Sequence, residues 1–160
     1  MKTIMIAAMG YNHVIGVGED MPWDVPEEYQ HFLNTVEGHT ILMGRVTFLL
    51  SQPHLKDTHN LVVSRSTDEI EGAEVFATLD AALERAEELG GTLFIGGGGT
   101  VYAQALPFAD EMHLSYIPHP TGGDFEGNVY FPAFDRDAWA VAQREDRGSY
   151  TFVIYRRRSA

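Results

Sequence analysis

The chain contains no cysteine, and only two of its 160 residues, Lys2 and Lys56, are lysine. The lack of cysteine excludes disulfides, thiolate zinc sites, iron–sulfur clusters and a cysteine nucleophile. No apolar run approaches the roughly 20 residues that a membrane-spanning helix needs. The apolar run at 4–9 is too short for a signal peptide, and no small-residue cleavage site follows it. We therefore expect a cytoplasmic protein that does not contact a membrane.

Positive charge is scarce, since 11 basic residues face 23 acidic ones and the net charge is −12. A surface this acidic repels phosphate backbones, so nucleic acid is not an expected partner. The acidic, lysine-poor balance favours adaptation to high salt over an ordinary acidic surface, because salt screens the repulsion between like charges. The seven histidines do not combine with carboxylates at metal-ligand spacing. No metal site is predicted.

The length fits one domain, 1–160, and a hydrophobic content of 44% is enough for one core. Turn-prone residues fill 10–24 and 118–127, and apolar strands alternate with helices over much of the rest. Strands are predicted at 4–9, 40–43, 60–64, 74–76, 92–95 and 112–117, helices at 26–36, 79–89 and 100–106, and a hairpin that pairs 139–144 with 150–156. This order predicts an α/β fold with a mainly parallel central sheet, an antiparallel C-terminal hairpin strand and helices on both faces.

Four consecutive glycines, 96–99, separate a predicted strand from a predicted helix. Glycine leaves the backbone amides accessible, so a phosphate can approach the positive end of the helix. The spacing is not the G-x-G-x-x-G dinucleotide fingerprint. The pattern by itself is therefore compatible both with a nucleotide site and with a tight strand-to-helix turn.

Arginine follows two further strands, in the segments 44–47 and 64–66. In open α/β sheets, ligands bind beyond the carboxyl ends of the strands. The planar guanidinium suits phosphate recognition, and arginines are few in this chain. Together with the glycine turn, the two segments predict a dinucleotide that bears an extra phosphate, which indicates NADPH.

A third group of residues combines a stiff loop with the start of a helix. Pro22 and Pro26 flank Trp23 immediately before the helix predicted at 26–36. On that helix Glu28 and Phe32 lie four residues apart and share one face. A carboxylate on an otherwise apolar face should have a raised pKa and should accept hydrogen bonds from a ligand. Glu27 is expected to point elsewhere, as a charge at the start of the helix.

These groups resemble the dihydrofolate reductase family in order, in nearly the same spacing, and over almost the whole chain. The acidic, lysine-poor composition is similar to that of haloarchaeal members. The residues that carry the resemblance are Ile6-Ala7-Ala8, Val14-Ile15-Gly16, Met21-Pro22-Trp23, Pro26 with Glu28 and Phe32, Met43-Gly44-Arg45-Val46-Thr47-Phe48, Gly97-Gly98 with Tyr102, and Glu126-Gly127 before Phe131-Pro132.

The resemblance implies NADPH-dependent reduction of 7,8-dihydrofolate to 5,6,7,8-tetrahydrofolate, with hydride transfer to C6 and protonation at N5. It also implies that antifolates such as methotrexate bind and that the protein is a monomer. Two alternatives stay open. A pyrimidine reductase of riboflavin synthesis shares the fold and the cofactor, although Trp23 and Glu28 argue against it. A non-catalytic nucleotide-binding module would bind NADPH without oxidising it.

By the same resemblance, Glu28 bonds the pterin, Trp23 holds a water, Met21 belongs to a loop that closes over the nicotinamide, and Ser115 replaces a threonine that bonds the carboxylate. These four are the expected catalytic residues. The expected substrate-binding residues are Ile6, Ala7, Tyr29, Phe32, Ser51, Leu55 and Ser115. The expected cofactor-binding residues are Ala8, Ile15, Gly16, Gly44, Arg45, Val46, Thr47, Ser64, Arg65, Ser66, Gly97, Gly98, Gly99, Thr100, Val101 and Tyr102.

The chain also departs from the family pattern elsewhere. Its glycine turn has one residue more than usual, and the segment 118–127 carries extra residues. Thr58 stands where the family has an arginine that binds the folate α-carboxylate, with Lys56 and His59 nearby as substitutes. Ser51 replaces an apolar residue of the benzoyl pocket, and Asn128 replaces a loop aspartate. These departures concern the glutamate tail and the loop rather than the reduction itself.

Overall fold

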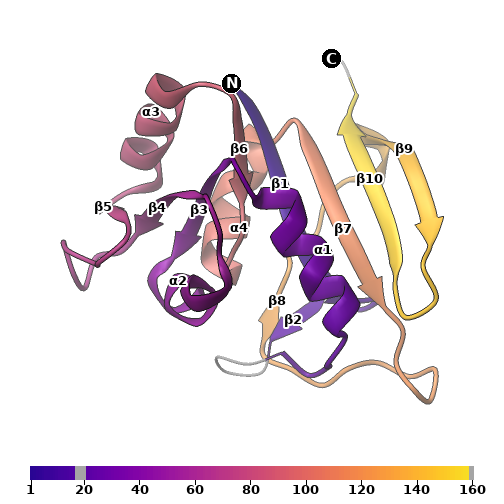
Figure 1. The fold of residues 1–160 in the computed structure, drawn as a ribbon. Coiled ribbons are helices and arrows are strands. Elements are labelled where there is room, and N and C mark those ends of the chain that lie inside the picture. The colour runs from indigo at the N-terminus through magenta and orange to yellow at the C-terminus, as the bar shows by residue number, and fades with distance from the viewer. Residues whose placement is uncertain (17–20, 159–160) are drawn as a thin grey trace.

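The computed structural model describes residues 1–16 and 21–158. Within them, eight strands form one sheet in the order β5-β4-β3-β6-β1-β7-β10-β9 (Figure 1). The strands are β1 Lys2–Gly10, β3 Thr40–Gly44, β4 His59–Val63, β5 Glu74–Phe76, β6 Thr92–Ile95, β7 Glu111–Ile117, β9 Trp139–Asp146 and β10 Thr151–Arg157. Neighbours run parallel from β5 to β7, whereas β10 is antiparallel to β7 and β9. The predicted fold class is confirmed.

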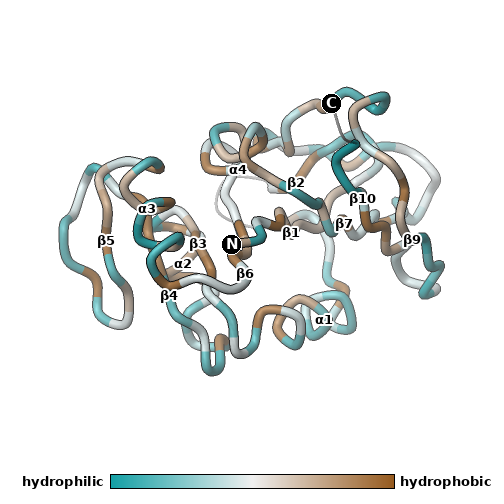
Figure 2. The backbone as a smooth tube through the Cα atoms, turned by 90° about the horizontal axis from the view of Figure 1, so that it is seen from above, coloured by the Kyte–Doolittle hydropathy of each residue, from teal (hydrophilic) through white to brown (hydrophobic). Residues whose placement is uncertain are grey.

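Helices cover both faces of this sheet. They are α1 Pro26–Val36, α2 Arg45–Ser51, α3 Leu79–Leu89 and α4 Gly99–Ala105, with short 3₁₀ turns η1 Gln52–His54, η2 Leu106–Phe108 and η3 Arg136–Ala138. One core cluster joins α3 and α4 to the sheet, and a second joins α1 and α2 to its other face. Figure 2 shows α1 and α4 on opposite sides of β1. Within 1–16 and 21–158, no helix is long and apolar enough to cross a membrane.

Local signals in the sequence explain the helices whose bounds were predicted. Pro26 opens α1, and acidic residues occupy its positive first turn. At α3, the Thr78 hydroxyl accepts a hydrogen bond from the Ala81 backbone N–H, and Gly90 with φ +70° ends the helix. The bounds of α1, α3, β5 and β6 are those predicted.

Other elements differ from the prediction. β4 and α4 each begin and end one residue earlier, and Leu106 belongs to a 3₁₀ turn. Two short strands, β2 Val14–Gly16 and β8 Val129–Tyr130, pair with each other although no strand was predicted there. Strands of two or three residues are too short to show a periodic pattern. Residues 17–20 of the predicted turn segment lie outside the described residues.

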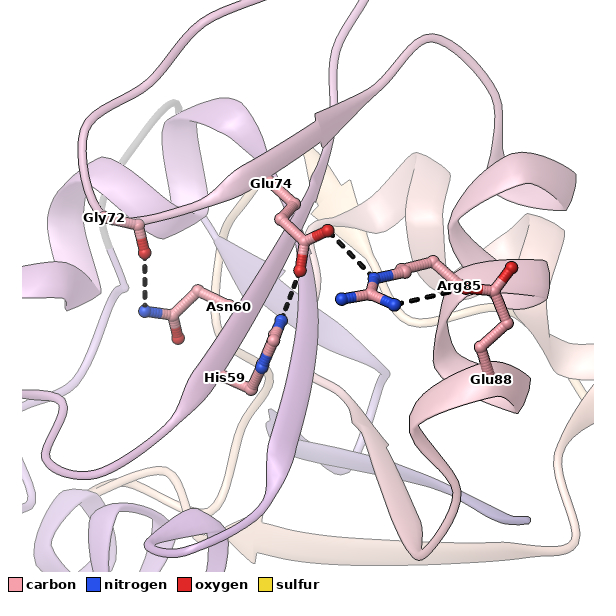
Figure 3. A network of polar contacts seen from close by, with 6 residues as sticks. All are labelled: His59, Asn60, Gly72, Glu74, Arg85 and Glu88. Atoms are coloured by element: carbon pink, nitrogen blue, oxygen red, sulfur yellow. Dashed lines mark hydrogen bonds and ion pairs between the residues drawn. The ribbon is translucent and has the colours of Figure 1, made fainter.

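A polar network fastens the β4–β5 edge to α3 (Figure 3). His59 Nε2 is paired with the Glu74 carboxylate, whose other oxygen accepts a hydrogen bond of 2.9 Å from Arg85 Nε. Arg85 also contacts Glu88 at 3.1 Å. Such exposed pairs add little stability. Their consequence here is that His59, named above as a substitute cation for the substrate tail, is already bound to a carboxylate.

Candidate active site

Glu28 lies in the first turn of α1 and is buried, with only 7% of its surface exposed. It forms a side-chain hydrogen bond with Ser115 on β7, in which the hydroxyl donates to the carboxylate. Burial raises the pKa of Glu28 to about 7, and the bond from Ser115 offsets part of this rise. The raised pKa expected from the helix face is confirmed. Glu27 is exposed and bonded to Ser149, as expected for a residue on the other side of the helix.

Aromatic and apolar side chains surround the next turn of α1. The rings of Tyr29 and Phe32 stack with centroids 5.9 Å apart. The Tyr29 hydroxyl lies 3.0 Å from His54 Nδ1 and is also hydrogen-bonded to Ser51. Burial raises the pKa of Tyr29. These contacts join α1 to α2 and η1 beside the buried carboxylate.

The other expected substrate residues divide between the two faces of the sheet. Phe32 and Leu55 pack against the cluster that contains Ile6, on the face that carries α1. The side chain of Ala7 belongs to the cluster on the opposite face, because neighbouring residues of a strand point to opposite sides. The structure thus brings Ile6, Phe32 and Leu55 together, and it excludes the Ala7 side chain from that group.

Trp23 lies against the same face as α1. Its ring meets Phe125 edge to face at 5.2 Å, and it packs against the cluster formed by Ile117, Tyr150 and Phe152. Met21, which the resemblance placed in a closing loop, is 46% exposed. The residues just before it, 17–20, lie outside the described residues.

A cleft of about 770 Å³ lies beyond the carboxyl ends of β3 and β4, beside the glycine turn. Its volume falls within the range typical of small-molecule sites. The cleft is lined by residues of the three strand-to-helix segments that the sequence analysis singled out, at 44–47, 64–66 and 96–99. Expected cofactor residues in its lining are Gly44, Arg45, Val46, Thr47, Ser64, Arg65, Gly98, Gly99, Thr100 and Val101.

The glycine turn has a defined register. Gly97 has φ +110°, a conformation that side-chain-bearing residues rarely adopt, and the Gly97–Gly98 peptide is cis. The Gly44 N–H donates to the Gly97 carbonyl at 2.7 Å, and the Tyr102 N–H donates to the Gly98 carbonyl at 2.9 Å. A Cβ at position 98 would lie 3.2 Å from Thr47 Oγ1. The turn therefore presents bare backbone to the cleft at Gly98 and Gly99.

Two arginines in the cleft are not neutralised by the described residues. Neither Arg45 nor Arg65 forms an ion pair or side-chain hydrogen bond with residues 1–16 or 21–158. Elsewhere, Arg85 and Arg147 contact carboxylates. Two unpaired guanidinium groups in a protein of net charge −12 favour an anionic ligand at this place.

Some expected cofactor residues lie outside the cleft lining. Ile15 and Gly16 belong to β2, and Ser66 lies beside the lining with its hydroxyl 3.2 Å from that of Ser64. Tyr102 is buried, and its hydroxyl donates to the Ile6 carbonyl at 2.7 Å. Ala8 packs against the same cluster as Trp23, on the α1 face, and Gly97 is buried within the turn.

Sequence reasoning missed one wall of the cleft, formed by residues 77–80, Gln104 and Phe108. The start of α3 was predicted correctly, with Thr78 two residues after the end of β5. The segment between β5 and α3 is a fourth strand-to-helix junction at the same edge of the sheet. Its position after a parallel strand could have indicated that residues 77–80 line the cleft. In the described part of the chain, no three histidine, aspartate or glutamate side chains gather as they would around a metal ion.

The family model for dihydrofolate reductase matches residues 2–157. The chain belongs to the dihydrofolate reductase family. It is 34% identical to dihydrofolate reductase HdrB of Haloferax volcanii over 99% of this chain and 84% of that protein. It is 37% identical to a dihydrofolate reductase of Neisseria meningitidis serogroup A, over 98% of this chain and 99% of that one.

A solved structure has the same fold. The dihydrofolate reductase of Enterococcus faecalis complexed with NADP(H) and RAB-propyl superposes with a TM-score of 0.85. The match covers 99% of this chain and 97% of that one, at 24% identity. Enzymes of the dihydrofolate reductase family are NADP-dependent oxidoreductases.

Proposed function

We propose that this protein reduces 7,8-dihydrofolate to 5,6,7,8-tetrahydrofolate with NADPH, by hydride transfer to C6 and protonation at N5. The observation that carries the proposal is the pairing of two sites. One is a buried carboxylate, Glu28, beside stacked aromatic rings, and the other is a cleft with unpaired arginines. Antifolates such as methotrexate should bind at the first site.

Glu28 is the residue that binds the heterocycle. Its carboxylate accepts hydrogen bonds from a ring N–H and an adjacent amino group, and Ser115 fixes its orientation. A carboxyl group whose pKa is about 7 exchanges its proton readily at neutral pH, so it favours protonation of the bound ring. A water held by Trp23 and shielded by Met21 carries the proton to N5.

Side chains around Glu28 form the rest of the substrate site. Phe32 and Leu55 pack against the cluster that contains Ile6 and would contact the rings of the substrate there, and Tyr29 stacks beside Phe32. The glutamate tail of the substrate is bound differently from the family pattern, because Thr58 replaces the arginine that binds its α-carboxylate. The Thr58 hydroxyl donates to Asn60 at 2.8 Å, and His59 is already paired with Glu74. Lys56, exposed nearby, is the remaining cation for the tail carboxylate.

The cleft fits the cofactor by its bare glycine backbone and its unpaired guanidinium groups. Gly98 and Gly99 allow a pyrophosphate close to the backbone, and Thr47 and Ser64 add hydroxyl groups. Arg45 and Arg65 bind the additional phosphate, which distinguishes NADPH from NADH. When bound, NADPH supplies the hydride.

The direct test is the loss of absorbance at 340 nm from NADPH with and without dihydrofolate, in low and in high potassium chloride. We expect oxidation that depends on dihydrofolate and is abolished by methotrexate. Binding of NADPH without oxidation at either salt concentration would instead indicate a binding module. Oxidation that requires the aminopyrimidine of riboflavin synthesis would indicate the pyrimidine reductase.

A further inference from the structure

The turn between β9 and β10 contacts α1 although more than 100 residues separate them. Arg147 Nη1 donates to His31 Nδ1 at 3.0 Å across a sequence separation of 116 residues. Ser149 in the same turn is hydrogen-bonded to Glu27. Figure 1 shows this turn at the same end of the sheet as the start of α1. The C-terminal hairpin therefore holds the helix that carries Glu28.

Arg147 is itself held in place by its own hairpin. Its guanidinium donates to the Tyr150 hydroxyl at 3.0 Å and contacts the Glu145 carboxylate at 3.3 Å. It also lies 4.8 Å from the centre of the Phe152 ring. Because these three contacts already order the Arg147 side chain, its hydrogen bond to His31 costs little additional side-chain entropy.

Phe152 connects this contact to the buried carboxylate. It lies directly opposite Ser115 in the β10–β7 ladder, and Ser115 is the residue that bonds Glu28. His31 follows Glu28 by three residues, about one helical turn, and its ring packs edge-on against Phe152 at 4.6 Å. The first turns of α1 thus contact the sheet at two neighbouring points, Glu28 on Ser115 and His31 on Phe152.

The His31 side chain depends on Arg147 for its hydrogen bonding. Burial, with the nearby charges of Arg147 and His113, lowers the pKa of His31, so its ring is neutral near pH 7. Its Nε2 is buried and finds no partner among the described residues. Without Arg147, both ring nitrogens would lack a partner, and a buried unpaired polar group is costly. The ring would have to turn toward water and move α1 with it.

We propose that Arg147 is a positioning residue for Glu28. Its hydrogen bond to His31 seats the first turns of α1 on β7 and β10, and so keeps water from the carboxylate. The significance for catalysis rests on the proposed function. Other titratable or charged groups around Glu28 and His31 are Tyr29 on α1, Tyr102 on α4, His113 and Glu111 on β7, and Glu145 on β9.

The test compares Arg147→Met with Arg144→Met in the ligand-free protein. Both variants lose one positive charge from the same hairpin. Arg144 is exposed and has no side-chain partner among the described residues, so its replacement removes the charge without breaking a contact. The pKa of Glu28 is measured by NMR with ¹³C-labelled glutamate, its signal assigned by its loss in Glu28→Gln. We expect Arg147→Met to lower this pKa by about half a unit or more toward 4.5, and Arg144→Met to leave it unchanged.

Variants at His31 and at Arg147 itself separate positioning from a general loss of structure. His31→Phe keeps a ring against Phe152 without nitrogens, so adding Arg147→Met to it should not lower the pKa further. Arg147→Lys, which keeps an N–H donor, should restore most of the wild-type value. If Arg147→Met does not fold, Arg147→Gln, which keeps an uncharged N–H donor, is measured in its place and should hold the wild-type pKa.

The kinetic readout is the pH at which kcat/KM declines, which should move with the pKa of Glu28. An unchanged Glu28 pKa in folded Arg147→Met, or an equal fall in Arg144→Met, would overturn the positioning role. So would a low Glu28 pKa in folded Arg147→Gln. A wild-type protein that shows the expected pKa values but no reductase activity would refute the proposed function and leave the positioning role standing.

Discussion

The surroundings of Glu28 and the cleft beside the glycine turn use polar groups in opposite ways. Glu28 is buried, hydrogen-bonded to Ser115, and enclosed by rings and by the contacts of the β9–β10 turn. Arg45 and Arg65 line an open cleft and lack partners among the described residues. The first region derives its chemistry from the removal of water around one acid. The second derives it from positive charge left available in an acidic protein.

The largest effect expected on the first region is loss of turnover in Glu28→Gln. The amide neither gains nor loses a proton near neutral pH, so it cannot act as an acid or base, and kcat at pH 7 should fall about 100-fold or more. The affinity for NADPH, measured by fluorescence titration, should stay within about twofold, because the two regions use different residues. Glu27→Gln, an exposed neighbour, is the matched control. Near-wild-type turnover in Glu28→Gln would remove the central role of this carboxylate.

The corresponding change in the second region is the double variant Arg45→Met/Arg65→Met. Loss of two charged hydrogen-bonding groups should weaken NADPH binding about 10- to 100-fold and should change NADH binding much less. Arg144→Met/Arg158→Met, which removes two positive charges at exposed positions outside the cleft, is the control for net charge. Equal weakening for the two cofactors would show that these arginines do not recognise the additional phosphate.

The same Glu28→Gln variant should be more stable than the wild type at alkaline pH. The folded-state pKa of Glu28, about 7, is above its ordinary value of 4.5, so the folded protein binds a proton more readily than the unfolded chain. Wild-type stability should therefore fall as pH rises from 4.5 to 7. At pH 8 the variant should gain about 3 kcal/mol, or roughly 6–12 °C in Tm, and at pH 4.5 it should gain almost nothing. A gain that is independent of pH in thermal unfolding would contradict the raised pKa.

Salt should change NADPH binding in the cleft more than the pKa of Glu28. These changes should be smaller than those of the variants above. With a net charge of −12, Tm should rise by several degrees between 0.1 and 2 M potassium chloride, because screening reduces repulsion. Over the same range NADPH affinity should decrease, since salt screens Arg45 and Arg65 in the open cleft, while the pKa of buried Glu28 should change little. A Tm that is the same in dilute buffer would argue against adaptation to high salt.

The sequence was most informative where local rules act. Pro26, the acidic first turn and the four-residue spacing of Glu28 and Phe32 predicted both the bounds of α1 and the acid on its buried face. The rule that ligands bind at the carboxyl ends of parallel strands predicts from the sequence that the segments around Arg45 and Arg65 line one site. Both predictions depend only on periodicity and on strand order.

What could not be predicted depends on contacts between distant segments. Nothing near His31 or Arg147 in the sequence indicates that they meet, because their contact follows from the packing of the hairpin against α1. The pairing of His59 with Glu74 likewise results from the register of β4 and β5. β2 and β8 were missed because so short a pair is set by its surroundings rather than by a pattern of its own.

The most direct measurement is a crystal structure of the protein with methotrexate and oxidised cofactor. The account predicts that the Glu28 carboxylate hydrogen-bonds the inhibitor's heterocycle, with Phe32 against the ring and a cofactor phosphate between Arg45 and Arg65. An inhibitor bound elsewhere, with Glu28 touching only Ser115 or turned to solvent, would contradict it.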